Sequence, residues 1–250
     1  MQTTRVDVPT GDGVADADLT VPAGEGPFPA VLFYMDAFGL RPRLVEMAER
    51  IAARGYLVLA PNLFHRAGRA PLFDLSRLAD PEQRGALFES LMPLLGSLTP
   101  EVVAADTGAY LDFLAARDDV APGPVAITGY CMGGTNALRA IEAHPHRIAA
   151  AASFHGGRIV TEAPDSPHLG VGAVTGELYF GHADQDRSMT ADQIATLEKT
   201  LDAAGVRYRS EVYAGATHGF TMADTAAYDE QATERHFAAL FALLDRTFRR

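Results

Sequence analysis

The chain alternates short apolar runs with longer segments whose apolar residues recur at helical spacing. The runs at 28–35 (FPAVLFYM), 56–61 (YLVLAP) and 124–130 (PVAITGY) are almost continuously apolar, as expected of strands that are buried on both faces. Segment 41–55, between the first two runs, has helical periodicity and ends in glycine. Strands that alternate with helices predict an α/β fold, with a mostly parallel central sheet and helices on both faces.

The rest of the chain continues this alternation. Residues 5–10 and 14–22 alternate in polarity around "GDG", which predicts an antiparallel hairpin at the N-terminus. Further strands are predicted at 147–156, 176–183 and 207–213, and further helices at 100–117, 134–144, 190–205 and 228–248. Because no repeat or low-complexity linker interrupts the pattern, we expect residues 1–250 to form a single domain.

Charge and cysteine content restrict the partners. The chain has 21 basic and 32 acidic residues, a formal net charge of −11, and no basic cluster that would favour nucleic acid. Its apolar segments stop well short of the roughly 18–20 residues that a membrane span needs. One cysteine allows no internal disulfide and no multi-cysteine metal site, and we see no signal-peptide pattern. We therefore expect a cytoplasmic monomer or small homo-oligomer that binds no nucleic acid, membrane, metal or cofactor.

The single cysteine lies at a strand end, within the sequence Gly129-Tyr130-Cys131-Met132-Gly133. This has the spacing of a nucleophile elbow, G-x-S-x-G, with cysteine in place of serine. The flanking glycines allow a strained turn, and the Met132 N–H at the start of a helix would face a developing oxyanion. The alternative is a small buried cysteine with no chemical role.

Two further strand ends supply an acid and a base. In α/β hydrolases the chain order is nucleophile, acid, histidine, and here Cys131 is followed by Asp186 in "HADQDRSM" and by His218 in "GATHGF". We prefer Asp186 to Asp184 as the acid, because Asp184 leaves its strand early. Asp186 would hold the His218 tautomer and stabilise the imidazolium.

Asp36 follows the strand at 28–35 and needs its own explanation. In α/β hydrolases the end of this strand supplies the second oxyanion N–H, here that of Ala37. A carboxylate beside that position would oppose an oxyanion. Asp36 either controls the proton of the thiol or serves as the N-cap of the following helix.

On these residues the sequence resembles the dienelactone hydrolase family of α/β hydrolases. The shared stretches are "GYCMGG", "DAFGLRP", "GYLVLAPNLFHR", "ADQDRSM" and "THGF". The resemblance implies an α/β-hydrolase fold without a large cap. It also implies a triad of Cys131, His218 and Asp186, oxyanion donors from Ala37 and Met132, and an acid at position 36 that activates the thiol.

The chain departs from the family at two places. Family members carry glutamate where this chain has Asp36, and they use arginines for the substrate carboxylate, one of them shortly after the catalytic histidine. Here "HGFTMADTAAY" offers no arginine. Arg84 and Arg66 are the candidates for this contact, and Tyr130 and His155 are further candidate pocket residues.

The sequence thus predicts a hydrolase of small-molecule carboxylic esters or lactones that works through a thioester on Cys131. Two alternatives stay open. One is a degenerate hydrolase that only binds its partner. The other is a glutamine-amidotransferase-like cysteine enzyme, which would need a glutamate shortly after the histidine.

Overall fold

The fold is described from a computed structural model of residues 1–248. At positions 78, 79, 81, 82 and 84 only the backbone is described. The elements in chain order are β1 (Gln2–Thr10), β2 (Gly13–Val21), β3 (Ala30–Tyr34), α1 (Pro42–Ala52), β4 (Leu57–Pro61), η1 (Leu75–Ala79), α2 (Pro81–Ser97), α3 (Pro100–Ala115), β5 (Val125–Tyr130), α4 (Met132–Ala143), β6 (Ile148–Phe154), η2 (Pro167–Ala173), β7 (Glu177–Ala183), α5 (Ala191–Ala204), β8 (Arg207–Tyr213) and α6 (Glu230–Phe248).

The strands form an eight-stranded sheet in the order β1-β2-β4-β3-β5-β6-β7-β8. Strands β4 to β8 in this order pair in parallel, whereas β2 pairs antiparallel with both β1 and β4. The predicted mostly parallel sheet and the predicted N-terminal hairpin are both confirmed. The central strands β3, β4 and β5 are buried along their whole length, in agreement with their continuous apolar sequences.

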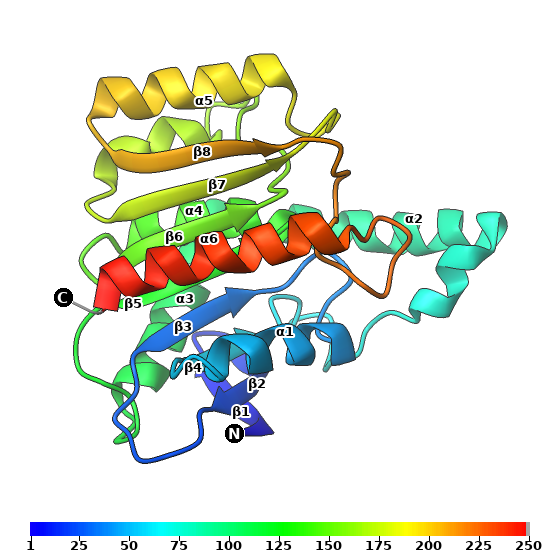
Figure 1. Ribbon diagram of the computed structural model, residues 1–250. Coiled ribbons are helices and arrows are strands. Elements are labelled where there is room, and N and C mark those ends of the chain that lie inside the picture. Colours follow the sequence, from blue (N-terminus) through cyan, green and yellow to red (C-terminus); the bar gives the residue numbers. More distant parts are fainter. Residues whose placement is uncertain (249–250) are drawn as a thin grey trace.

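Helices cover both faces of the sheet. In Figure 1, α1 and α6 lie in front of it, and α3 and α4 lie behind it. α5 and α4 both pack against η2. Within the described residues, no helix is long and apolar enough to span a membrane.

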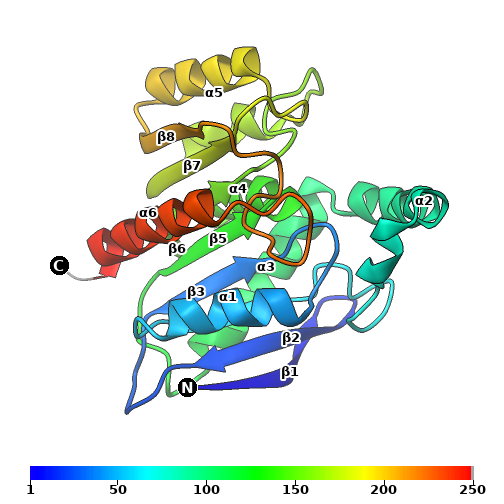
Figure 2. The ribbon, with the colours of Figure 1, turned by 45° about the vertical axis from the view of Figure 1, so that its right-hand side comes forward.

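The parallel strands end at one edge of the sheet, and α2 lies beyond that edge. Both ribbon views show α2 extending outward on this side, away from the layered body (Figures 1 and 2). Leu87 and Leu91 of α2 are buried, while Phe88 and Met92 are exposed. Phe88 makes an edge-on ring contact with Phe38, which follows β3. This contact brings α2 to the edge where the polar strand-end residues gather.

Candidate active site

Cys131 lies on a tight turn between β5 and α4. Its backbone has φ 56° and ψ −120°, a conformation that is strained for a residue with a side chain. A Cβ atom on Gly129 would lie 2.0 Å from the Gly133 carbonyl oxygen, and one on Gly133 would lie 2.4 Å from the Met35 carbonyl oxygen. Only glycine fits at both positions, as the elbow pattern predicts. The half-buried thiol is thereby held at the N-terminus of α4.

His218 and Asp186 meet beside this turn. His218 Nδ1 lies 2.6 Å from Asp186 Oδ2, and the other carboxylate oxygen accepts bonds from the Ser188 N–H and hydroxyl at 2.8 and 2.7 Å. Burial raises the pKa of Asp186, but the bonds from His218 and Ser188 outweigh burial and lower it. The carboxylate is therefore ionised and fixed at neutral pH.

The charge state of His218 depends on the same contacts. Burial lowers the pKa of His218, but the bonds to Asp186 and to Cys131 outweigh it and raise the pKa to about 10. The imidazole is therefore protonated at neutral pH in the free protein.

The carboxylate of Asp184, the alternative acid, does not contact His218. Its carboxylate accepts a bond from the Gly215 N–H at 2.9 Å, and its own N–H bonds the Ala216 carbonyl. It therefore supports the turn that precedes His218 without contacting the imidazole. The geometry favours Asp186, the acid that the sequence analysis preferred.

The two predicted oxyanion donors lie at neighbouring backbones. As the first residue of α4, Met132 has an N–H with no acceptor inside its helix. Within the described part of the chain, no acceptor is bonded to the N–H of Ala37. The first turn of α4 touches the end of β3, because Gly133 abuts the carbonyls of Tyr34 and Met35. This geometry is compatible with a shared oxyanion site.

Asp36 lies beside Arg41 and not at the N-terminus of α1. The N-cap of α1 is Arg41, without a side-chain cap, so the N-cap interpretation is wrong. The Asp36 side chain is 5% exposed, and its carboxylate accepts bonds from both terminal nitrogens of Arg41, at 2.6 and 2.9 Å. Burial raises the pKa of Asp36 and Arg41 opposes that rise. Among the described hydrogen bonds, this carboxylate has none to Cys131.

His155 lies behind Cys131. Its Nδ1 accepts a bond from the Cys131 N–H at 3.1 Å, and its Nε2 bonds Thr221 Oγ1 at 2.9 Å. Burial and the charge on His218 both lower the pKa of His155, so the ring is neutral and its Nε2 carries the proton. His155 is completely buried, and it supports the elbow instead of lining a pocket.

The structure does not place the other sequence candidates, Tyr130, Arg66 and Arg84, in contact with a substrate. Tyr130 is completely buried and its hydroxyl bonds His236, so it does not face a substrate. The Arg66 guanidinium binds the carboxylates of Asp12 and Asp106, which ties the β1–β2 turn to α3. The Arg84 side chain lies outside the described residues.

The same cluster contains side chains of the kinds that bind metal ions. Within the described residues, Asp12, His65 and Asp106 bring possible ligand atoms within 4.8 Å of one another. Because Arg66 already bonds both carboxylates, a cation side chain fills the place that a metal ion would take.

A cavity of about 410 Å³ adjoins the elbow. Its lining includes Met132, Thr135, Gly157 and Arg158 beside the elbow and Met92, Leu95 and Leu98 from α2 and the loop after it. A Cβ on Gly157 would lie 3.6 Å from the His218 ring, so this wall of the cavity also borders His218. The guanidinium of Arg158 has no hydrogen-bond or ion-pair partner among the described residues. Sequence reasoning missed Arg158, which follows a predicted strand by only a few residues.

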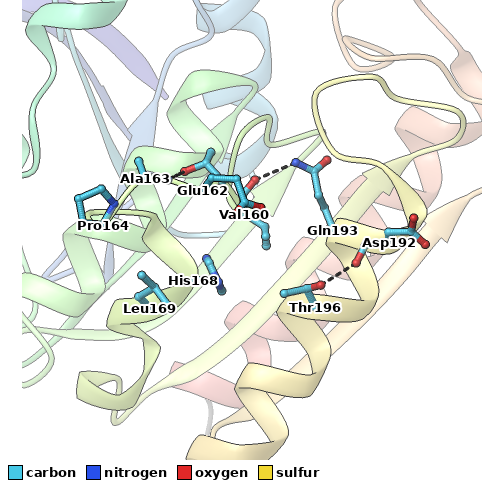
Figure 3. Close-up of a pocket in the computed structure, with 10 residues that line it drawn as sticks. Val160, Glu162, Ala163, Pro164, His168, Leu169, Asp192, Gln193 and Thr196 are labelled. Atoms are coloured by element: carbon cyan, nitrogen blue, oxygen red, sulfur yellow. Dashed lines mark hydrogen bonds between the residues drawn. The ribbon is translucent and has the colours of Figure 1, made fainter.

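A second hollow, of about 470 Å³, lies between segment 160–169 and α5 (Figure 3). Gln193 crosses it to bond the Val160 carbonyl at 2.8 Å. None of Cys131, Asp186 and His218 lines this hollow, and none of them lines the elbow cavity. The elbow cavity is the one that adjoins these residues, because Met132 follows Cys131 and Gly157 borders the His218 ring.

Comparisons with known proteins show the family to which this chain belongs. The sequence model of the dienelactone hydrolase family matches residues 15–248. A Synechocystis protein provisionally named a carboxymethylenebutenolidase is 26% identical over 93% of this chain and 92% of its own length. An Escherichia coli protein with the same provisional name is 27% identical over 90% of this chain and 79% of its own. The crystal structure of a Klebsiella pneumoniae protein, provisionally described as a dienelactone hydrolase, has the same fold, with a TM-score of 0.81, 22% identity and 97% of both chains covered.

Proposed function

The chain belongs to the dienelactone hydrolase family, and from this premise we propose that it hydrolyses carboxylic esters or lactones through a thioester on Cys131. The observation that carries the proposal is the 2.6 Å bond between His218 and Asp186 beside the strained cysteine turn. Family membership supports hydrolysis in general, and this geometry supports the assignment of the individual residues.

In the proposed acylation step, Cys131 Sγ attacks the carbonyl carbon of the substrate. The carbonyl oxygen takes the negative charge and accepts the N–H groups of Ala37 and Met132. When the tetrahedral intermediate collapses, the bond to the leaving oxygen breaks, and His218 gives its proton to that oxygen. The products of this step are an alcohol, or the opened end of a lactone, and a thioester.

In the proposed deacylation step, the now neutral His218 removes a proton from water. The hydroxide attacks the thioester carbonyl, the C–S bond breaks, and the acid leaves while the imidazolium and the thiolate are restored. Asp186 holds the tautomer that directs His218 Nε2 at the reacting atoms.

The test is a rapid-mixing experiment with p-nitrophenyl acetate. We expect a burst of one p-nitrophenolate per protein chain, together with an acetyl adduct on Cys131 detected by mass spectrometry. Cys131→Ala should abolish both. An unchanged burst in that variant would remove Cys131 from the mechanism. The absence of any turnover on a panel of esters and lactones by the native protein would favour a role in binding alone.

The elbow cavity supports a more specific proposal about the substrate. Met92, Leu95 and Leu98 offer apolar contact, and Arg158 offers a cation without a partner in the described structure. We propose Arg158, in place of Arg84 or Arg66, as the contact for an anionic group on the acyl side. Arg158→Gln should raise the KM for mono-p-nitrophenyl succinate by about tenfold, since a lost charged hydrogen bond costs about 1.5 kcal/mol. The KM for the neutral p-nitrophenyl butyrate should not change.

A further inference from the structure

Arg41 joins the two loops on which the proposed reaction depends. It immediately precedes α1, its side chain is 7% exposed, and its carboxylate partners lie on both loops. Asp36 belongs to the loop after β3 that carries Ala37. Asp224 belongs to the loop between β8 and α6 that carries His218.

All five N–H donors of this guanidinium are used. Nη1 donates to Asp36 Oδ1 at 2.6 Å and to the Gly39 carbonyl at 3.1 Å. Nη2 donates to Asp36 Oδ2 at 2.9 Å and to Asp224 Oδ1 at 3.2 Å. Nε donates to Asp224 Oδ2 at 2.5 Å. A lysine ammonium has three donors on one atom and cannot reproduce two planar, bidentate contacts at once.

We propose that Arg41 is a positioning residue that holds the oxyanion loop and the histidine loop in register, and that Asp36 is its anchor and not the base for the thiol. This inference rests on the proposed function above. Both Asp36 oxygens are bound by Arg41, and Oδ1 also accepts the Phe38 N–H at 3.1 Å. The carboxylate is therefore held in place one residue before the Ala37 donor.

Charge supports the same conclusion. A bare carboxylate at position 36 would oppose negative charge on the substrate oxygen beside Ala37, and Arg41 offsets it at contact distance. Removing the cation would leave the Asp36 carboxylate buried without its partner, which is strongly unfavourable. The loop that carries Ala37 should then rearrange.

Two other contacts restrain the histidine loop near the same place. Arg43 donates to the Thr221 carbonyl at 2.9 and 3.3 Å, and His155 bonds the Thr221 hydroxyl. The contacts of Arg43 and His155 restrain only the loop that carries His218, because neither side chain reaches the loop that carries Ala37. Among these three side chains, Arg41 alone contacts both loops, so its loss should disturb the alignment of donor and base.

The test measures the acylation rate of the p-nitrophenyl acetate burst in Arg41→Met, Asp36→Asn and the double variant. Arg41→Met should slow acylation on the order of 100-fold, the size expected from a misplacement of about 1 Å, with a much smaller change in KM. The double variant should recover at least part of this rate, because it removes the unpaired charge. Guanidinium at non-denaturing concentrations should partly restore an Arg41→Ala variant.

Arg50→Met is the matched control for stability. Arg50 lies within α1 and binds Glu234 of α6, and among the described residues it makes no hydrogen bond or ion pair to either loop. It should acylate within about twofold of the native rate even if its Tm falls, since the pair is solvent-exposed. If Arg41→Met acylates at the native rate, the positioning role is wrong.

The role of Asp36 has its own decisive outcome. If Asp36→Asn alone is as slow as Arg41→Met and the double variant is no faster, Asp36 is the base for the thiol and our assignment is wrong. A failure of the proposed function looks different. In that case the native protein gives no burst, or Cys131→Ala leaves the burst intact.

Discussion

Two acids lie two residues apart after β7, and their surroundings give them different roles. Asp186 contacts the imidazole of His218, whereas Asp184 contacts the backbone of Gly215. Asp186→Asn should lower kcat by about 10³–10⁴-fold, because the tautomer and the imidazolium lose their support. Asp184→Asn should keep kcat within a few-fold and lower only the Tm. Steady-state kinetics and thermal unfolding of both variants test the assignment, and equal losses of kcat would contradict it.

The protonation of His218 gives a pH prediction. Its pKa in the folded protein is raised to about 10 from an ordinary value of 6.5. The stabilisation from the charged pair is therefore complete below about pH 6.5 and is lost as the pH rises through the folded pKa. The measurement compares the Tm of the Cys131→Ala variant with that of the double variant Cys131→Ala/His218→Asn. The difference between these two Tm values should shrink by a few degrees above pH 7. The Cys131→Ala background removes the contribution of the thiol, so the folded pKa there lies below 10. A constant Tm difference across this pH range would show that His218 is not held as a cation.

The residues that sequence reasoning could find are those that directly follow strands. Cys131, Asp186 and His218 follow β5, β7 and β8, and parallel strands bring their ends to one edge. Arg41 could not be found in this way, because one of its partners lies 183 positions away on a loop without a pattern. His155 was found as a strand-end residue, but its φ of 40° turns the chain so that the ring lies behind Cys131. Propensity carries no information on such a turn.

At the scale of elements, the start of α4 shows where local propensity misleads. The sequence predicts this helix from residue 134, yet it begins at Met132. On propensity alone this early start is unfavourable, since glycines at positions 133 and 134 weaken a helix. Close contact with β3 and β6 requires them there, since a Cβ on Gly134 would lie 2.5 Å from Ser153 Oγ. Packing against the sheet therefore overrides propensity in the turn that carries Cys131.

This contact makes Gly133→Ala a test of the elbow. The added Cβ would meet backbone oxygens of Met35 and Tyr34 at 2.4 and 2.5 Å, which neither strand nor helix can relieve without moving. We expect the burst to be lost and the Tm to fall by many degrees. Gly85→Ala in α2 is the control, because nothing lies within 4 Å of its Cβ. That change should be neutral or stabilise by about 0.5–1 kcal/mol. A Gly133→Ala variant with native Tm and burst would contradict the steric argument.

At the scale of the whole molecule, the alternating pattern predicted the layers but not the order of strands. Nothing in the apolar runs says that β4 lies between β2 and β3, or that β2 turns antiparallel to β4. That order decides which strand ends are central. It places β3 and β5, with Ala37 and Cys131 after them, next to each other in the middle of the sheet. The proposed oxyanion site, with donors from both strand ends, depends on this adjacency.

The core also bears on the prediction of a single domain. One continuous apolar cluster extends from Val8 in β1 to Leu244 in α6, and the elements before and after Cys131 both contribute to it. A core shared in this way favours unfolding in one cooperative step. Far-UV circular dichroism, tyrosine fluorescence and loss of the burst should therefore have the same midpoint in guanidinium. The chain has eight tyrosines and no tryptophan, so tyrosine emission reports on both halves. Separated midpoints for dichroism and fluorescence would divide the chain into two folding units. Loss of the burst alone at lower denaturant would instead show that the loops joined by Arg41 open before the sheet unfolds.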